Sequence, residues 1–179
     1  MFDDSDVKIV GKKPSETVKK HIVDYSDELL PKELAAASKK LGVTLAEIFL
    51  KSIDSVFVDD TTDSQMLIQR RLLLSFTVNA VLDDYCINDT VSGIAVKSFL
   101  DTLAKKSPQV YESCNDTGAF SFYYLAYRRR TEVERRIGQT FAMLCAHDGD
   151  PIYQELGEAL YCWFVSVVKS EIDKLSLNK

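Results

Sequence analysis

Aromatic and arginine side chains gather in the sequence between residues 120 and 136. At helical spacing, Phe120, Tyr123, Tyr127 and Arg130 share one face. Such a face can stack a flat ring or hold an anion by cation–π and bidentate contacts. The alternative is a solvated helix laced with i,i+4 ion pairs. The expected pairs are Arg128–Glu132, Arg130–Glu134 and Glu132–Arg136.

Two arginines fall within otherwise apolar helical stripes, Arg71 and Arg130. A partly buried guanidinium needs a carboxylate or a bound anion to offset its lost hydration. We therefore predict that both arginines are at least partly buried and paired. Arg71, Tyr127 and Arg130 are the candidate ligand-binding residues, with structural ion pairing as the alternative.

Two acidic runs could hold a hard cation such as magnesium. The stretch Asp59-Asp60-Thr61-Thr62-Asp63 resembles the DDxxD motif of the all-helical terpenoid synthases, and Asp83-Asp84 follows it. That family needs a much larger helical barrel to enclose its substrate. Asp and Thr between two helices are also favoured as turn and N-cap residues. We interpret the first run as a cap and expect no tightly held metal.

The His147-Asp148 pair resembles the HD motif of helical metal-dependent phosphohydrolases. The other histidine, His21, is far upstream and in no matching motif. A structural interpretation explains the whole segment, with Gly149 as a helix C-cap and Asp150 as an N-cap. The four cysteines form no CxxC pair, so a zinc site and other cofactors are not expected.

Residues 32–53 resemble a helix-turn-helix. A helix over residues 32–41 would end at Gly42, and Thr44 would cap a second helix with Glu47 completing a capping box. A recognition helix normally carries Arg, Lys, Asn or Gln on its exposed face. This one is nearly neutral there, and the chain has a net charge of -5. Nucleic-acid binding is therefore not expected.

Helical periodicity and the scarcity of turn residues, with 7 Gly and 4 Pro, predict an all-α fold. We expect a single-domain helical bundle of about six to eight helices over residues 14–179, preceded by a flexible tail over residues 1–13. The two apolar stripes of the helix at 65–85 indicate burial on most sides. The other expected helices cover residues 14–23, 88–105, 116–147 and 152–175.

The C-terminal helix contains the run LYCWFVSVV at residues 160–168, which is apolar all round. Leu156, Leu160, Trp163 and Val167 form a stripe that can face the core. On the other side lie residues such as Phe164 and Val168, which would have to be buried against a second surface, such as that of another subunit. We predict a homodimer through this helix, the alternative being a helix buried centrally within one chain.

No stretch names a reaction, and the catalytic residues are unknown. The sequence has no GxSxG, P-loop, GxGxxG or HExxH motif. We rank a non-catalytic interaction or self-associating protein first. A small-molecule or anion-binding sensor with a pocket near Tyr127 and Arg130 is second, and a magnesium-dependent enzyme using the acidic runs is third. With no signal peptide and no membrane span expected, we predict a soluble cytoplasmic protein with reduced cysteines.

Overall fold

The computed structural model describes residues 31–54, 64–114 and 117–179, and within them it contains seven helices and no strand. The predicted all-α fold is confirmed. The expected tail at 1–13 and helix at 14–23 lie outside the described residues. The helices are α1 Lys32–Asp54, α2 Ser64–Tyr85, α3 Asp89–Lys106, α4 Pro108–Ser113, α5 Thr117–Arg128, α6 Val133–Leu144 and α7 Pro151–Lys174.

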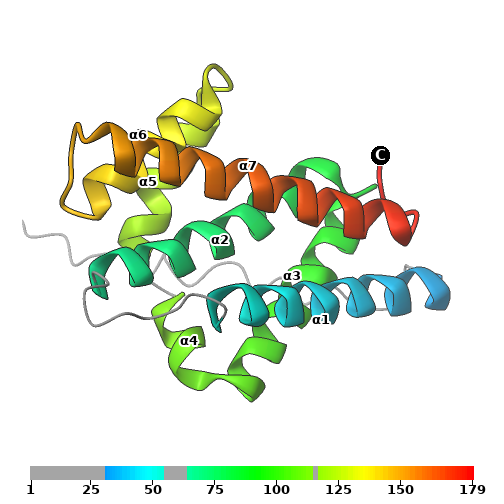
Figure 1. Cartoon of the computed structure of the whole chain (residues 1–179). Helices are drawn as coiled ribbons and strands as arrows, with labels where there is room; N and C mark the ends of the chain where they lie inside the picture. Colours follow the sequence, from blue (N-terminus) through cyan, green and yellow to red (C-terminus); the bar gives the residue numbers. More distant parts are fainter. Residues whose placement is uncertain (1–30, 55–63, 115–116) are drawn as a thin grey trace, which may run out of the picture.

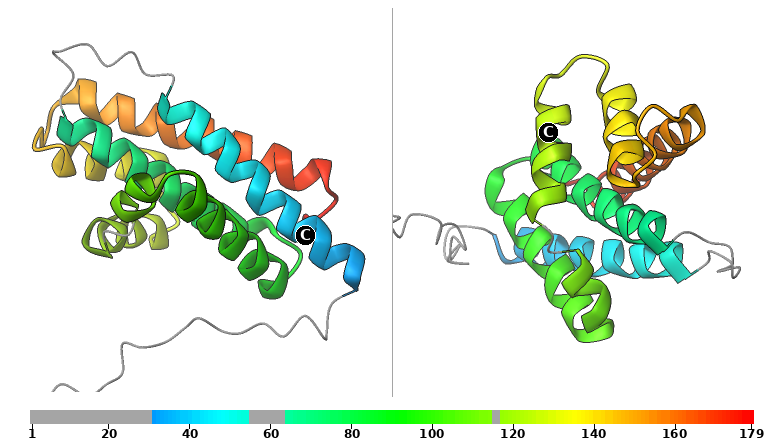
Figure 2. Two further views of the ribbon diagram at one scale, coloured as in Figure 1. Left: turned by 90° about the horizontal axis from the view of Figure 1, so that it is seen from below. Right: turned by 90° about the vertical axis from the view of Figure 1, so that its left-hand side faces the viewer.

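Helix α2 lies at the centre of the molecule, between α7 on one side and α1 on the other (Figures 1 and 2). It contacts each of the other six helices. One side, with Leu74 and Val78, joins a core shared with α1, α3 and the C-terminal half of α7. Another side, with Leu72 and Phe76, joins a second core with α5, α6 and Tyr161. The predicted burial of this helix on most sides is confirmed.

Several helix ends follow the predicted caps. The Asn88 side chain accepts a hydrogen bond of 2.9 Å from the Val91 backbone N–H at the start of α3. The Asp150 side chain accepts one of 2.8 Å from Ile152, with Pro151 opening α7. These local signals hold because the cap satisfies backbone N–H groups that have no partner within the helix. The short α4, which begins at Pro108, was not predicted.

Helix α1 runs unbroken through Gly42 and Thr44, so the predicted helix-turn-helix is wrong. Gly42 is a contact point and not a helix end. A Cβ built on it would lie 2.2 Å from the Ala95 carbonyl oxygen and 2.8 Å from the Phe99 nitrogen, both on α3. Because glycine has no side chain, the backbones of α1 and α3 can approach each other closely at this point.

The long helix predicted over residues 116–147 is two helices, α5 and α6, separated by residues 129–132. Arg130 and Glu132 in this connection have left-handed backbone angles, with φ of 56° and 48°. An α-helix cannot contain such residues, so the chain reverses there. Consequently Phe122, expected in the core stripe, is exposed, while Tyr123 of the same helix is fully buried.

The end of α6 is closed by Ala146, which has a φ of 61°. The His147 N–H donates to the Ala142 carbonyl at 2.9 Å, the pattern of a Schellman cap. Gly149, also left-handed at φ 79°, lies in the turn before α7 and is not the cap that we predicted. The His147 ring stacks on Tyr153 at 3.8 Å between centroids.

Helix α7 is rotated relative to the prediction. Phe164 and Val168 are fully buried within one chain, whereas Trp163 and Leu156, expected inside, are exposed by 44% and 37%. The central packing that we gave as the alternative therefore accounts for Phe164 and Val168. No helix in the described part of the chain is both long and apolar enough to span a membrane.

Candidate functional site

The candidate site lies where the C-terminal half of α2 faces α5. The ring of Phe76 on α2 packs against those of Phe120, Tyr123 and Tyr127, at centroid distances of 5.9, 5.5 and 5.9 Å. The predicted aromatic face of α5 is thus confirmed, and its partner is a single phenylalanine. Edge-to-face and tilted ring pairs of this kind hold the two helices in register.

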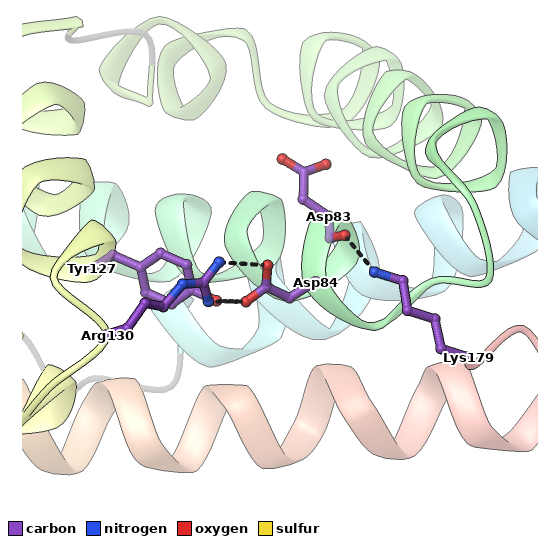
Figure 3. A network of polar contacts seen from close by, with 5 residues as sticks. All are labelled: Asp83, Asp84, Tyr127, Arg130 and Lys179. Atoms are coloured by element: carbon purple, nitrogen blue, oxygen red, sulfur yellow. Dashed lines mark hydrogen bonds and ion pairs between the residues drawn. The ribbon is translucent and has the colours of Figure 1, made fainter.

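Asp84, in the last turn of α2, joins the two predicted site residues Tyr127 and Arg130 (Figure 3). The Arg130 guanidinium donates through both terminal nitrogens to the two carboxylate oxygens, one of these bonds measuring 3.0 Å. The Tyr127 hydroxyl donates to the same carboxylate, and its ring lies 4.7 Å beneath the guanidinium carbon. Pairing of Arg130 is therefore confirmed.

The predicted burial of Arg130 is wrong. Its side chain is 60% exposed, and that of its partner Asp84 is 29% exposed. The reason is its place in the connection after α5 and not within a helical stripe. The predicted pair of Arg130 with Glu134 is replaced by the pair with Asp84. Glu132 pairs with Arg135 at 3.4 Å and, as predicted, with Arg136 at 3.9 Å.

The electrostatics of the site keep each group in its ordinary protonation state. Hydrogen bonding to Arg130 lowers the pKa of Asp84. Burial raises the pKa of Tyr127, and the hydrogen bond to Asp84 adds to this shift. The tyrosine therefore stays protonated as a donor, and the carboxylate stays charged with its oxygens occupied. Such a network can hold an element in place but offers neither a free base nor a nucleophile.

Asp83 and Asp84 do not converge on a common ligand. The Asp83 carboxylate points away from Asp84 in Figure 3 and accepts a hydrogen bond of 2.6 Å from Ser92. The Lys179 ammonium group lies 3.4 Å from the Asp83 carbonyl oxygen. Within the described residues, no group of three His, Cys, Asp or Glu could hold a metal. The run at residues 59–63 lies outside them.

Arg71 is not part of this site. It lies on α2, half-buried, where its charge acts on the thiol of Cys114. Burial raises the pKa of that thiol to about 11, and the arginine opposes the shift. Among the described residues no ion pair involves Arg71, so its predicted partner is not found there.

Two open clefts flank α5. One, of about 640 Å³, lies between α2 and α5 and is lined by Phe76, Tyr124, Tyr127 and Arg130 among others. The other, of about 320 Å³, lies between α5 and α6 and includes Phe122, Arg129 and Met143. Leu125 lines both clefts, so α5 forms a ridge between two grooves.

The sequence reasoning missed Asp84 as the partner of Tyr127 and Arg130, although a signal was present. Asp83 and Asp84 end a helix, where the negative end of the helix dipole disfavours carboxylates. Two acids at such a position favour a cation nearby. The exposed ridge of α5 was also missed, because it depends on where the long helix breaks.

Replacing Asp84 with asparagine is expected to lower the free energy of unfolding by about 1 kcal/mol at neutral pH, a modest value because Arg130 is exposed to water. The pKa of Asp84 is lower in the folded state than in the unfolded chain. Its contribution is therefore complete above the unfolded pKa, near 4, and is lost as the pH falls through the folded pKa.

Urea denaturation of wild type and Asp84→Asn at several pH values would check this. The difference in stability should disappear at acidic pH. Asp101→Asn, an exposed position on α3 without an ion pair among the described residues, is the control and should change little at any pH. A difference for Asp84→Asn that stays constant down to the acid transition would contradict the role of its charge.

In comparisons with protein-family models, curated proteins and solved structures, this chain has no match. The described site is an aromatic ridge between two clefts, held in place by the contacts of Asp84 with Tyr127 and Arg130.

Proposed function

We propose that the protein is a non-catalytic interaction protein whose helix α5 docks an acidic, amphipathic helix of a partner protein. The observation that carries the proposal is the exposure of Phe122, Tyr124 and Leu125, at 49%, 57% and 60%. These are three large apolar or aromatic side chains on one 12-residue helix. Contiguous exposed apolar surface of this kind is typical of binding surfaces, and aromatic residues are enriched where partners meet.

The shape around α5 suits a helix better than a small ligand. The walls Tyr124 and Leu125 are themselves more than half exposed, whereas a small-molecule pocket buries most of its ligand. A partner helix could place its own apolar side chains on either side of Leu125, into the two clefts. This is the helix-in-groove mode of recognition.

Charge at the end of α5 indicates an acidic partner. Arg128 and Arg129 are exposed, and no carboxylate of the described residues pairs with either of them. They border the two clefts, Arg128 on the α2 side and Arg129 on the α6 side. The same clefts also contain Asp83, Asp84 and Asp148, so the positive charge is confined to the guanidinium groups at the end of α5. Carboxylates flanking an apolar helix face would complement it.

A small molecule in the α2–α5 cleft is the second candidate. Its support is the volume of about 640 Å³ together with the aromatic walls Phe76, Phe120 and Tyr127. A flat aromatic ligand could stack there. Native mass spectrometry of the purified protein would detect such a ligand as a mass retained after gentle desolvation.

Self-association through the C-terminal helix remains part of the proposal, although on a face other than the one first predicted. A cytoplasmic location also remains a proposal. Its support is that the four cysteines are free thiols and that three of them, Cys86, Cys114 and Cys145, are buried.

A displayed library of amphipathic helices with either acidic or basic polar faces would test the α5 proposal. We expect enrichment of acidic helices. Their affinity should fall about tenfold or more in Leu125→Glu and Tyr124→Ala. Val43→Glu, an exposed apolar position on α1, is the matched control and should bind as wild type does. Selected peptides that bind all variants equally, or no enrichment at all, would contradict the proposal.

A further inference from the structure

The outer face of α7 carries a regular stripe directly opposite its buried side. The buried side consists of Gly157, Tyr161, Phe164, Val168 and Ile172. The stripe consists of Ile152, Leu156, Ala159, Trp163, Ser166 and Ser170, all of them exposed. Successive members are four and three residues apart in alternation, which is the spacing of the a and d positions of a coiled coil.

The apolar half of this stripe is substantial, with Ile152 exposed by 73%, Trp163 by 44% and Leu156 by 37%. The other half, Ala159, Ser166 and Ser170, consists of small residues. When this stripe is reversed and set against itself, each large residue lies opposite a small one, so the face is complementary to itself.

We propose that α7 pairs with α7 of a second copy of this chain in antiparallel orientation, centred near Cys162. This inference rests on the self-association included in the proposed function and adds the face and the register. In this register Ala159 lies opposite Trp163 of the second copy, Leu156 opposite Ser166, and Ile152 opposite Ser170. Every layer then sets a large side chain against a small one, as close helix packing requires.

Charge favours the same arrangement. Glu155 and Lys169 border the stripe on the same side as Cys162, seven residues away from it in either direction. In an antiparallel pair Glu155 of one copy faces Lys169 of the other. The two-fold symmetry repeats this contact, so the pair contains it twice. Within its own chain the Lys169 ammonium group lies 3.9 Å from the centre of the Tyr85 ring.

A parallel pair lacks both advantages. Each member of the stripe would then meet its own copy, so two Trp163 indoles would occupy one layer and two serine layers would remain underpacked. The two Cys162 residues, which border the stripe on one side only, would lie on opposite sides of a parallel pair. The antiparallel interface consists of a single pair of helices, smaller than the standard interface of about 1,600 Å². We therefore expect reversible association, with a dissociation constant of micromolar order.

Sedimentation equilibrium over a range of concentrations tests whether the chain self-associates. Wild type should show a monomer–dimer equilibrium. Trp163→Glu and, independently, Ala159→Glu should weaken dimerisation at least about tenfold. Both positions are exposed in the monomer, so circular dichroism and thermal unfolding of the variants should resemble wild type. Leu125→Glu, on the unrelated α5 ridge, is the control and should dimerise normally.

Cross-linking at Cys162 tests the register. It is the one exposed cysteine of the four, all of which are described, and the antiparallel register brings it next to its own copy. A short bismaleimide should give a covalent dimer with wild type and none with Cys162→Ser. A dimer that resists Trp163→Glu or does not cross-link would overturn the antiparallel pairing but leave self-association standing. A monomer at all concentrations would overturn both.

Discussion

Replacing Gly42 with alanine should destabilise the protein by about 3 kcal/mol, the upper part of the range for overpacked sites. In an ordinary helix interior the same change stabilises by about 1 kcal/mol, so the expected sign is reversed. The reason is that the new methyl group would lie 2.2 Å from the Ala95 carbonyl oxygen and 2.7 Å from Ser98 Cβ. The nearest obstacles include α3 backbone, which cannot turn aside as a flexible side chain can.

Urea denaturation monitored by circular dichroism would measure this loss. Val43→Ala is the matched control because it changes the next residue of the same helix, at a partly exposed position. Its effect should be within about 0.5 kcal/mol, as for most surface substitutions. A stabilising effect of Gly42→Ala would mean that α1 and α3 do not touch at this point and that Gly42 lies in an ordinary helix interior.

Phe164→Ala should cost about 3–5 kcal/mol, the usual range for deleting a buried phenylalanine. Phe164 is fully buried and its ring packs 6.4 Å from that of Phe49, centroid to centroid. It joins α7 to the core of α1 and α3. Trp163→Ala, the adjacent residue on the exposed side, should cost about 1 kcal/mol or less although it removes a larger side chain.

The comparison should be made in dilute solution, where the proposed dimer contributes little to the measured stability. The pair of variants reports the rotation of α7 directly. If Trp163→Ala were the more destabilising of the two, the helix would face the core as the sequence pattern first suggested. The proposed antiparallel dimer would then lose its surface.

Structural features that depend on a few neighbouring residues were predicted correctly. The caps Asn88 and Asp150 and the opening proline Pro151 lie where expected. Each depends on one side chain and on backbone groups within three residues, so the sequence contains both partners of the interaction. The burial of α2 on two sides was likewise visible in its two apolar stripes.

Sequence patterns that fit two different structures led to wrong predictions. Gly42 suits a helix end and also a close helix contact, and only the presence of α3 decides between them. The segment at residues 128–134 has good i,i+4 charge spacing, yet the chain turns there with Arg130 in a left-handed conformation. Arg130 then binds Asp84, 46 residues away in sequence, a partner that local pairing rules cannot propose.

The sequence alone was enough to predict that the chain is helical, where most helices begin, and that α2 is buried on most sides. These properties follow from residue composition, periodicity and capping. The tertiary structure decided which side of α7 is buried, because a helix that is apolar all round has no preferred face until its neighbours are in place. It likewise decided that α5 projects an exposed ridge and that Tyr127 and Arg130 meet on Asp84, since these depend on contacts between residues far apart in the chain.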